Sequence, residues 1–255
     1  MRRGFVLVKY LLDDVWQDAE RAMTALFPPD SPGTLDFGGV PFPTCTALDQ
    51  VSLHPNILAF ARAYLGQDIL LSQSEAWCKD DRGADQRMHM DFGNHCFTAP
   101  AAEPEALAAI VYFDDVTETG GETKVVPFSD KHYPTDAWKR MPGISMPFAN
   151  DRTQAEVGQD PFRMSLYDAE VGVPAKKGDV LFYRHDVWHR GTPVKKGKTR
   201  RVLSLVFKKP NAHHIYNWGN GYARGNYRGK VEEMVRKLND DQKLALGIPL
   251  GKCRL

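Results

Sequence analysis

Hydrophobic and polar positions follow two different patterns along the chain. The opening residues 5–12 alternate, which predicts a first strand. Over residues 13–27, apolar side chains recur at helical spacing and predict an amphipathic helix, capped by one of the two aspartates at its start. The stretch 55–65 predicts a second helix, with Pro55 in its first turn and Gly66 at its end.

After this helical part the pattern changes to short β-type stretches separated by glycine-rich turns. The expected strands cover residues 69–78, 107–113, 123–126, 180–183 and 202–207. Two further helices are expected in the tail, over residues 230–238 and 240–246. Short strands preceded by helices predict a mainly β fold with flanking α-helices, in which a jelly-roll or barrel core carries a helical layer.

We interpret residues 1–255 as one domain in three parts. These are the first strand and helices in 1–66, the jelly-roll core in 67–210 and a helical tail in 211–255. One stretch, 129–170, does not fit, because it is rich in proline and poor in strand signals. A connection of this length in a compact domain is usually functional or disordered. We therefore expect it to form a lid over the pocket that is partly mobile without substrate.

Composition and charge narrow the possible partners. The chain has 42% hydrophobic residues and a net charge of +1, which gives no reason to expect nucleic acid or a membrane as a partner. Cys45, Cys78, Cys96 and Cys253 are scattered, so reduced thiols and a cytoplasmic location are expected. Lys9 interrupts the first apolar run, which argues against a signal peptide. We expect a monomer or homodimer that acts on a small molecule.

The first candidate chemistry lies at His89 and Asp91. Residues two apart in an extended strand point to the same face, so both side chains can reach one metal ion. Later, the β-rich run before residues 188–191 is expected to deliver His189 at its end. Two histidines and one carboxylate form the facial triad of non-haem iron(II) sites, which leaves positions open for oxygen. His185 is a rival third ligand, and we favour His189 because of the arginine that follows it.

That arginine is Arg200, eleven residues after His189, at the start of a strand. A guanidinium rooted in a barrel strand presents a rigid fork that binds a carboxylate through two hydrogen bonds. Arg200 and Arg201 point to opposite faces of the strand, so only one of them should face the barrel interior. A solvated basic hairpin is the competing interpretation, and it suits the neighbouring lysines.

Together these motifs resemble the phytanoyl-CoA dioxygenase family. The resemblance rests on the His89-x-Asp91 pair, the segment 188–191, Arg200 and a strand–turn–strand over residues 110–127. It spans roughly residues 4–210.

The resemblance implies a double-stranded β-helix core in which His89, Asp91 and His189 hold iron(II). It also implies that 2-oxoglutarate chelates the iron while Arg200 binds its far carboxylate. Family members consume O2 and 2-oxoglutarate, release succinate and CO2, and hydroxylate an unactivated carbon. Relatives that halogenate replace the carboxylate ligand with a small residue, so the presence of Asp91 favours hydroxylation.

Other polar and aromatic residues near these motifs are candidates for the pocket. For the cosubstrate they are Thr192, Ser204, Gln73 and Gln86. For the substrate they are Phe92, Asn94, His95, Trp77 and Trp188. Core packing is the competing interpretation for the aromatic residues, and a surface loop for His95. The substrate is left open among an acyl-CoA, a small zwitterion, a natural product and a protein side chain.

Two other functions agree with parts of this pattern. One is a cupin-like metal enzyme that does not use 2-oxoglutarate, which would have no need of Arg200. The other is a non-catalytic jelly-roll binding protein in which the triad is a coincidence. Formation of an iron–2-oxoglutarate chelate would separate both from the oxygenase.

Overall fold

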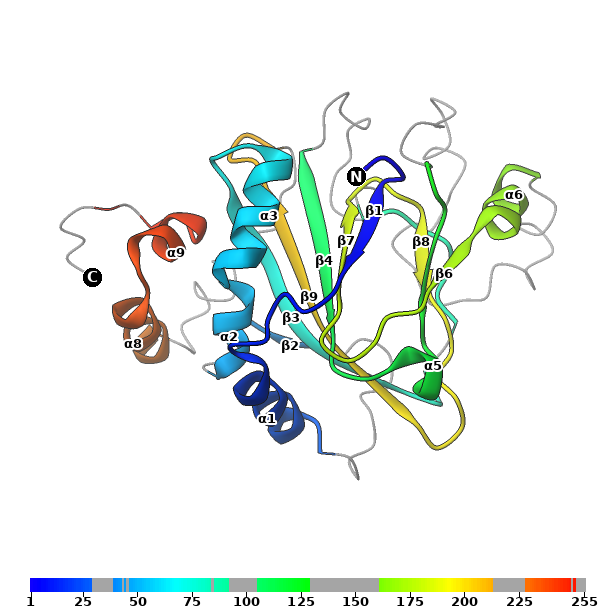
Figure 1. The fold of residues 1–255 in the computed structure, drawn as a ribbon, viewed down its shortest axis with the longest axis horizontal. Coiled ribbons are helices and arrows are strands. Elements are labelled where there is room, and N and C mark those ends of the chain that lie inside the picture. The colour runs from blue at the N-terminus through cyan, green and yellow to red at the C-terminus, as the bar shows by residue number, and fades with distance from the viewer. Residues whose placement is uncertain are drawn as a thin grey trace.

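Three helices near the N-terminus cover one face of a large sheet (Figure 1). The computed structural model describes residues 1–28, 39–42, 44, 46–83, 85–91, 105–128, 161–212, 228–248 and 250. After strand β1 (Phe5–Val8), the helices are α1 (Trp16–Leu26), α2 (Ala47–Ser52) and α3 (Pro55–Leu65). The third helix has the expected bounds, with Pro55 in the first turn and Gly66 at its end.

The predicted cap of the first helix was wrong. Val15 is the N-cap residue of α1, and it provides no side-chain hydrogen bond. Asp14 instead accepts a hydrogen bond from the buried His54, with 3.0 Å between His54 Nε2 and Asp14 Oδ1. The aspartate therefore ties the start of α1 to the start of α3, a long-range contact that local spacing does not reveal.

The large sheet has six antiparallel strands in the order β1-β7-β4-β9-β3-β2. Its remaining members are β2 (Gly39–Pro41), β3 (Leu70–Asp80), β4 (Ala106–Tyr112), β7 (Val180–Arg184) and β9 (Thr199–Lys208). A three-stranded antiparallel sheet in the order β6-β5-β8 lies against it. Its strands are β5 (Thr123–Val125), β6 (Val171–Val173) and β8 (His189–Gly191).

Alternation along the strands divides the core into separate hydrophobic clusters. In β9, Leu203, Leu205 and Phe207 pack against the helices, whereas Val202 and Val206 face the small sheet. The strands β4 and β7 divide in the same way. The inner face of the large sheet is therefore the face that can line a pocket.

The last part of the expected lid forms a helix, α6 (Pro161–Ala169), beside the small sheet (Figure 1). Residues 129–160, the greater part of that stretch, lie outside the described residues. A short helix, α5 (Val116–Thr119), precedes β5.

The tail helices α8 (Arg228–Lys237) and α9 (Asp240–Ala245) match the expected ones. Within the described ranges, no helix combines the length and apolar character that a membrane crossing requires.

Cys78 gives a simple test of the packing of β3. The side chain is buried, and burial raises the pKa of its thiol to about 11. At pH 8 about one thiol in a thousand is then ionised, and the thiolate is the reactive form. Iodoacetamide added to the native protein should leave Cys78 unmodified, as peptide mass mapping would reveal. Rapid alkylation without unfolding would mean that this face of β3 is open to solvent.

Candidate metal centre

Two backbone segments bring the predicted histidines together. His89 and His189 form an isolated antiparallel bridge, in which each amide donates to the other residue's carbonyl at 3.0 and 2.8 Å. His189 also pairs with Val125 of β5, so the small sheet fixes its position. Both histidines are about 95% buried. Strand pairing therefore places two residues that are far apart in sequence on adjacent positions of one sheet edge.

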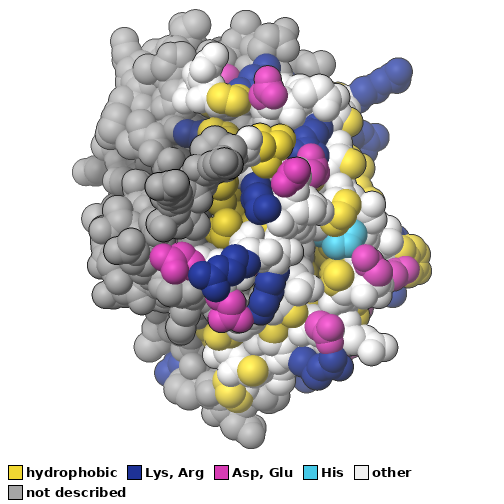
Figure 2. Space-filling model, turned by 90° about the vertical axis from the view of Figure 1, so that its left-hand side faces the viewer, with side chains coloured by type: hydrophobic (Ala, Val, Ile, Leu, Met, Phe, Trp, Pro, Cys, Tyr) yellow, Lys and Arg dark blue, Asp and Glu magenta, His cyan; other side chains and the backbone are white. Residues whose placement is uncertain are grey.

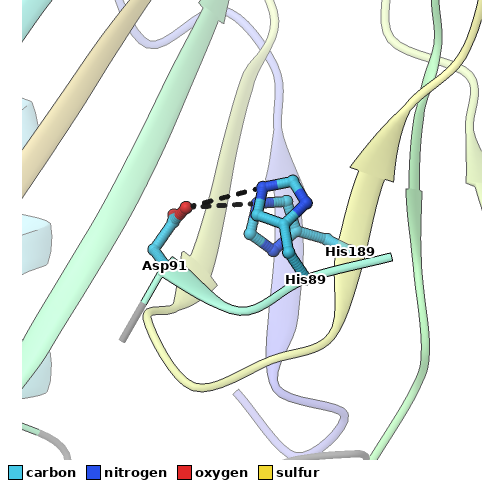
Figure 3. A group of neighbouring side chains, drawn as sticks. All are labelled: His89, Asp91 and His189. Atoms are coloured by element: carbon cyan, nitrogen blue, oxygen red, sulfur yellow. Dashed lines mark ion pairs between the residues drawn. The ribbon is translucent and has the colours of Figure 1, made fainter. Parts of the chain in front are cut away.

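The side chains of His89, Asp91 and His189 converge on one point (Figure 3). Asp91 Oδ1 lies 3.8 Å from Nε2 of His89 and 3.5 Å from Nε2 of His189. One ligand atom from each of the three side chains lies within 4.8 Å of the others. This spacing and donor set suit a single metal ion with two imidazoles and one carboxylate on one side.

Both imidazole rings are oriented for metal binding. Nδ1 of His89 lies 2.7 Å from the carbonyl oxygen of Arg87, and Nδ1 of His189 lies 2.9 Å from that of Val187. A carbonyl only accepts hydrogen bonds, so each Nδ1 carries the proton and each Nε2 presents its lone pair. Such backbone contacts fix the tautomer and ring orientation of metal-binding histidines.

Two details of the local structure differ from the prediction. The backbone of Asp91 is helical and not extended as predicted. His189 does not end the strand β7, which stops at Arg184; it begins the separate strand β8. The turn between β7 and β8 and the change of backbone conformation at Asp91 let the three side chains approach one point from different directions.

Tyr183 of β7 is a further neighbour of the triad, which the sequence alone did not assign to it. Its hydroxyl donates a hydrogen bond of 2.8 Å to Asp91 Oδ2, the oxygen that does not face the histidines. Burial and the Asp91 charge raise the pKa of Tyr183 well above its ordinary value. The hydroxyl therefore stays protonated and fixes the carboxylate. The inward alternation of β7 was the signal that could have identified it.

His185, the rival third ligand, lies on the other side of the same carboxylate. Its Nε2 is 3.9 Å from Asp91 Oδ2, and the side chain is buried. It is not part of the group formed by His89, Asp91 and His189. The geometry therefore favours His189.

Arg200 reaches the same interior from β9. Its Nη1 donates a 2.8 Å hydrogen bond to the carbonyl of Gly121, while its Nε is buried without a hydrogen-bond partner. Among the described residues no carboxylate forms an ion pair with it, and burial lowers the pKa of its guanidinium. A partly buried cation with a buried, unused donor is costly unless an anion binds to it.

Glycines make room for this arginine. A Cβ on Gly191, two residues after His189, would lie 2.6 Å from Oε1 of Gln86 and 3.9 Å from Nη1 of Arg200. Gly121 has a φ of +71°, and a Cβ there would lie 3.1 Å from Cδ of Arg200. The close approach at Gly121 favours glycine there, whereas at Gly191 the close contact would be with Gln86 and the guanidinium lies at ordinary contact distance beside the strand that carries His189.

Arg201 has a different environment. It makes hydrogen bonds of 2.7 and 3.0 Å to both carboxylate oxygens of Asp114, and one of 3.1 Å to Thr24 of α1. The Asp114 hydrogen bond raises the pKa of this arginine. Arg201 therefore faces the helical layer, and its charge is already paired.

The other candidates for the cosubstrate have definite contacts. Thr192 donates its hydroxyl to the carbonyl of Glu122, and Gln86 Oε1 accepts from the Gly191 amide. Ser204 and Gln73 lie on the inner faces of β9 and β3, where Gln73 donates to Glu75 at 3.0 Å. Gln86 and Arg200 both lie beside Gly191, whereas Gln73 and Ser204 lie further along the paired strands β3 and β9.

The substrate candidates separate into different groups. Trp77 packs on the inner cluster between the sheets. Trp188 is fully buried beside α6 with Met88, Met90 and Tyr167, a placement that favours packing over substrate contact. Phe92, Asn94 and His95 lie outside the described residues.

A cavity of about 710 Å³ lies elsewhere, between α1–α3 and the tail helices. Asp14, Asp49, His54, Lys237 and Gln242 are among the residues that line it. It is on the helical side of the large sheet, whereas the triad is on the other side. Figure 2 shows this helical face, where acidic and basic side chains are interspersed over the coloured part. The cavity is therefore separate from the metal centre.

Solved structures of similar architecture include non-haem enzymes described as dependent on alpha ketoglutarate. The epimerase SnoN in complex with Fe3+, alpha ketoglutarate and nogalamycin RO has a TM-score of 0.57 and 22% identity, over 82% of this chain and 80% of that one. The carbocyclase SnoK from nogalamycin biosynthesis has a TM-score of 0.58 and 17% identity, over 88% and 87%. EvdO2 from Micromonospora carbonacea var. aurantiaca has a TM-score of 0.57 and 18% identity, over 82% and 87%.

At these identities the likeness concerns the fold. It confirms the predicted class, a mainly β protein with flanking helices around a double-stranded β-helix core. No curated protein sequence matches the chain significantly. A family model described as phytanoyl-CoA dioxygenase matches residues 3–202, which is most of the chain and includes the triad and Arg200. The chain therefore belongs to the phytanoyl-CoA dioxygenase family.

Proposed function

We propose that this protein is an iron(II)- and 2-oxoglutarate-dependent dioxygenase that hydroxylates an unactivated carbon of a small molecule. The observation that carries the proposal is the combination of the His89–Asp91–His189 group with an arginine that has no carboxylate partner among the described residues. A metal centre alone fits many reactions. The added cation indicates a second bound group, a dicarboxylate that spans the interval between metal and arginine.

The residues present fit both groups. His89, Asp91 and His189 would hold the iron through Nε2, a carboxylate oxygen and Nε2, leaving the remaining positions for the keto acid and oxygen. Arg200 would bind the far carboxylate, to which its buried Nε can donate. Iron and 2-oxoglutarate together would activate O2, the oxidant of the reaction, which no side chain can do.

The protein's own residues have three tasks in this scheme. The backbone carbonyls of Arg87 and Val187 keep both imidazoles in the tautomer that binds metal. The Tyr183 hydroxyl occupies one Asp91 oxygen, so that the other faces the metal position. The apolar inner face of the large sheet excludes water from the reacting groups.

The class of substrate and the type of reaction can be narrowed by the solved structures of this fold and by Asp91. Solved structures of this fold include enzymes of nogalamycin biosynthesis, one of which was crystallised with nogalamycin RO. We therefore favour a small organic molecule over nucleic acid or a membrane lipid surface. Hydroxylation is favoured over halogenation because Asp91 occupies the carboxylate position of the triad.

An anaerobic titration tests the proposal. Iron(II) followed by 2-oxoglutarate should produce a weak visible charge-transfer band, because the keto acid chelates the metal. The same titration with succinate, which lacks the keto group, should give no band. Iron binding without a band for 2-oxoglutarate would favour a cupin-like metal enzyme, and failure to bind iron would favour a non-catalytic jelly-roll protein. Substrate-stimulated succinate formation in a metabolite screen would then identify the substrate.

A further inference from the structure

The two segments that carry the proposed metal ligands also have side chains that point away from the site. Three of these side chains belong to a buried cluster that includes residues of α6. Met88 and Met90 flank His89, and Trp188 precedes His189; all three pack in one buried cluster with Leu166 and Tyr167 of α6. The ligands thus face the interior while their immediate neighbours contact the helix. Any displacement of α6 would act directly on the backbone that positions the ligands.

A buried ion pair strengthens this contact. Arg190, the residue after His189, donates two hydrogen bonds of 2.7 and 2.8 Å to the carboxylate of Glu170, which directly follows α6. The side chains of Arg190 and Glu170 are 6% and 5% exposed. Arg190 Nη1 also donates to Asp85, and its guanidinium lies over the Tyr167 ring, 5.4 Å from the centroid. Three hydrogen bonds and one contact with an aromatic ring thus hold the Arg190 guanidinium in place.

Glu170 also contacts the small sheet through Lys124 of β5, at 3.4 Å. Burial alone would raise the pKa of Glu170, but the Arg190 hydrogen bond and charge outweigh it and lower the pKa. The carboxylate is therefore ionised near neutral pH and connects β5 and β8, the pair of strands that holds His189. A second link is independent of charge: the Met88 amide donates to the Tyr167 hydroxyl at 3.0 Å.

We propose that Glu170 and Tyr167 are positioning residues that hold the two histidine-bearing segments at the separation a metal ion requires. Glu170 acts on His189 through Arg190, and Tyr167 acts on His89 through the Met88 backbone. Neither side chain touches the metal position. This inference rests on the proposed metal site, and it assigns to α6 control of the ligand geometry.

The test compares Glu170→Gln and Tyr167→Phe with matched controls. Glu170→Gln keeps the size of the side chain but removes its charge, and Tyr167→Phe removes only the hydroxyl. Asp114→Asn is the control for the first, because it disrupts the two-bond pair with Arg201 on the helical face. Ser52→Ala is the control for the second, because it removes the buried Ser52–Ser74 hydrogen bond of 2.8 Å on that same face.

The readout is the dissociation constant for iron(II), measured anaerobically by calorimetry on metal-free protein, beside the melting temperature of each variant. Loss of a direct outer partner of a metal ligand typically weakens metal binding 10–100-fold, and because Glu170 and Tyr167 act one residue further away we expect losses at the lower end, about 10-fold, for Glu170→Gln and Tyr167→Phe. The two controls should lower the melting temperature but keep the wild-type affinity for iron.

Unchanged iron affinity in both α6 variants, with melting temperatures lowered as in the controls, would overturn the inference and leave α6 as packing only. The proposed function would survive that result, since the wild-type protein would still bind iron. Absence of iron binding by the wild type would overturn the proposed function and the inference with it. If Glu170→Gln fails to fold, Tyr167→Phe decides the question alone, because it retains the ring in its cluster.

Discussion

Iron binding should be lost when any one of His89, Asp91 and His189 is replaced by alanine, and turnover should be lost with it. Each residue supplies one of only three protein ligands in the proposed site. Removal of a direct ligand should therefore weaken binding by more than the roughly 10–100-fold typical of an outer partner. Anaerobic calorimetry with iron(II) measures the affinity, and succinate formation measures the turnover.

The matched control is His185→Ala. This histidine is as buried as the ligands but lies beside the opposite oxygen of Asp91. We expect it to retain iron binding within a few-fold, although turnover can fall because the carboxylate loses a neighbour. If His185→Ala abolished iron binding and His189→Ala retained it, the assignment of the third ligand would be wrong. All variants should keep the circular dichroism of the wild type, because the three side chains point toward one another and are not members of the hydrophobic clusters beside them.

The second large effect is expected at Arg200. A hydrogen bond to a charged group contributes about 1.5–3 kcal/mol, and we expect Arg200→Ala to lose about that much in total. Arg200→Ala should therefore weaken 2-oxoglutarate binding by about 10–150-fold, at 1.4 kcal/mol per factor of ten. Arg200→Lys should recover only part of this, because a single ammonium cannot replace the planar fork. Titration of 2-oxoglutarate into the iron-loaded variants, followed by the charge-transfer band, gives both values.

Arg201→Ala provides the contrast, because the structure gives the neighbouring arginine a different task. Its guanidinium is held by Asp114 and Thr24 at the helical layer. We expect this variant to lose stability, by roughly 0.5–3 kcal/mol as is usual for a disrupted partly buried contact, and to bind 2-oxoglutarate normally. Weaker cosubstrate binding in Arg201→Ala and normal binding in Arg200→Ala would reverse the assignment of the two faces.

Much of the architecture was predictable because local signals and tertiary structure agree. Pro55 and Gly66 fix the two ends of α3. Pro55 has no amide hydrogen to donate, and the amides of a first helical turn have no partner within the helix, whereas Gly66 ends the helix with a φ of +110°. Residues 202–207 were predicted as a strand, and β9 spans Thr199–Lys208 with one face against the helices. In both cases the predictive signal, a helix-end residue or a run of β-forming side chains, lies within a few residues of the chain, although β9 pairs with the distant strands β3 and β4.

The sequence by itself also determined the chemistry of the candidate site. His89, Asp91, His189 and Arg200 were identifiable because metal and carboxylate binding require particular residue types in a particular order. It could not determine which oxygen of Asp91 faces the histidines, because Tyr183 decides this from another strand.

Only the tertiary structure decided which faces the side chains occupy where the regular alternation breaks. In β3, the register shifts between Leu71 and Gln73, so two residues that are both odd-numbered face opposite sides of the sheet.

Only the tertiary structure also decided which charged side chains are paired and buried. Arg190 is the clearest case, because an exposed basic residue and a buried ion pair look alike in sequence. Its partners Glu170 and Asp85 lie 20 and 105 residues away, and only chain folding brings their charges within reach.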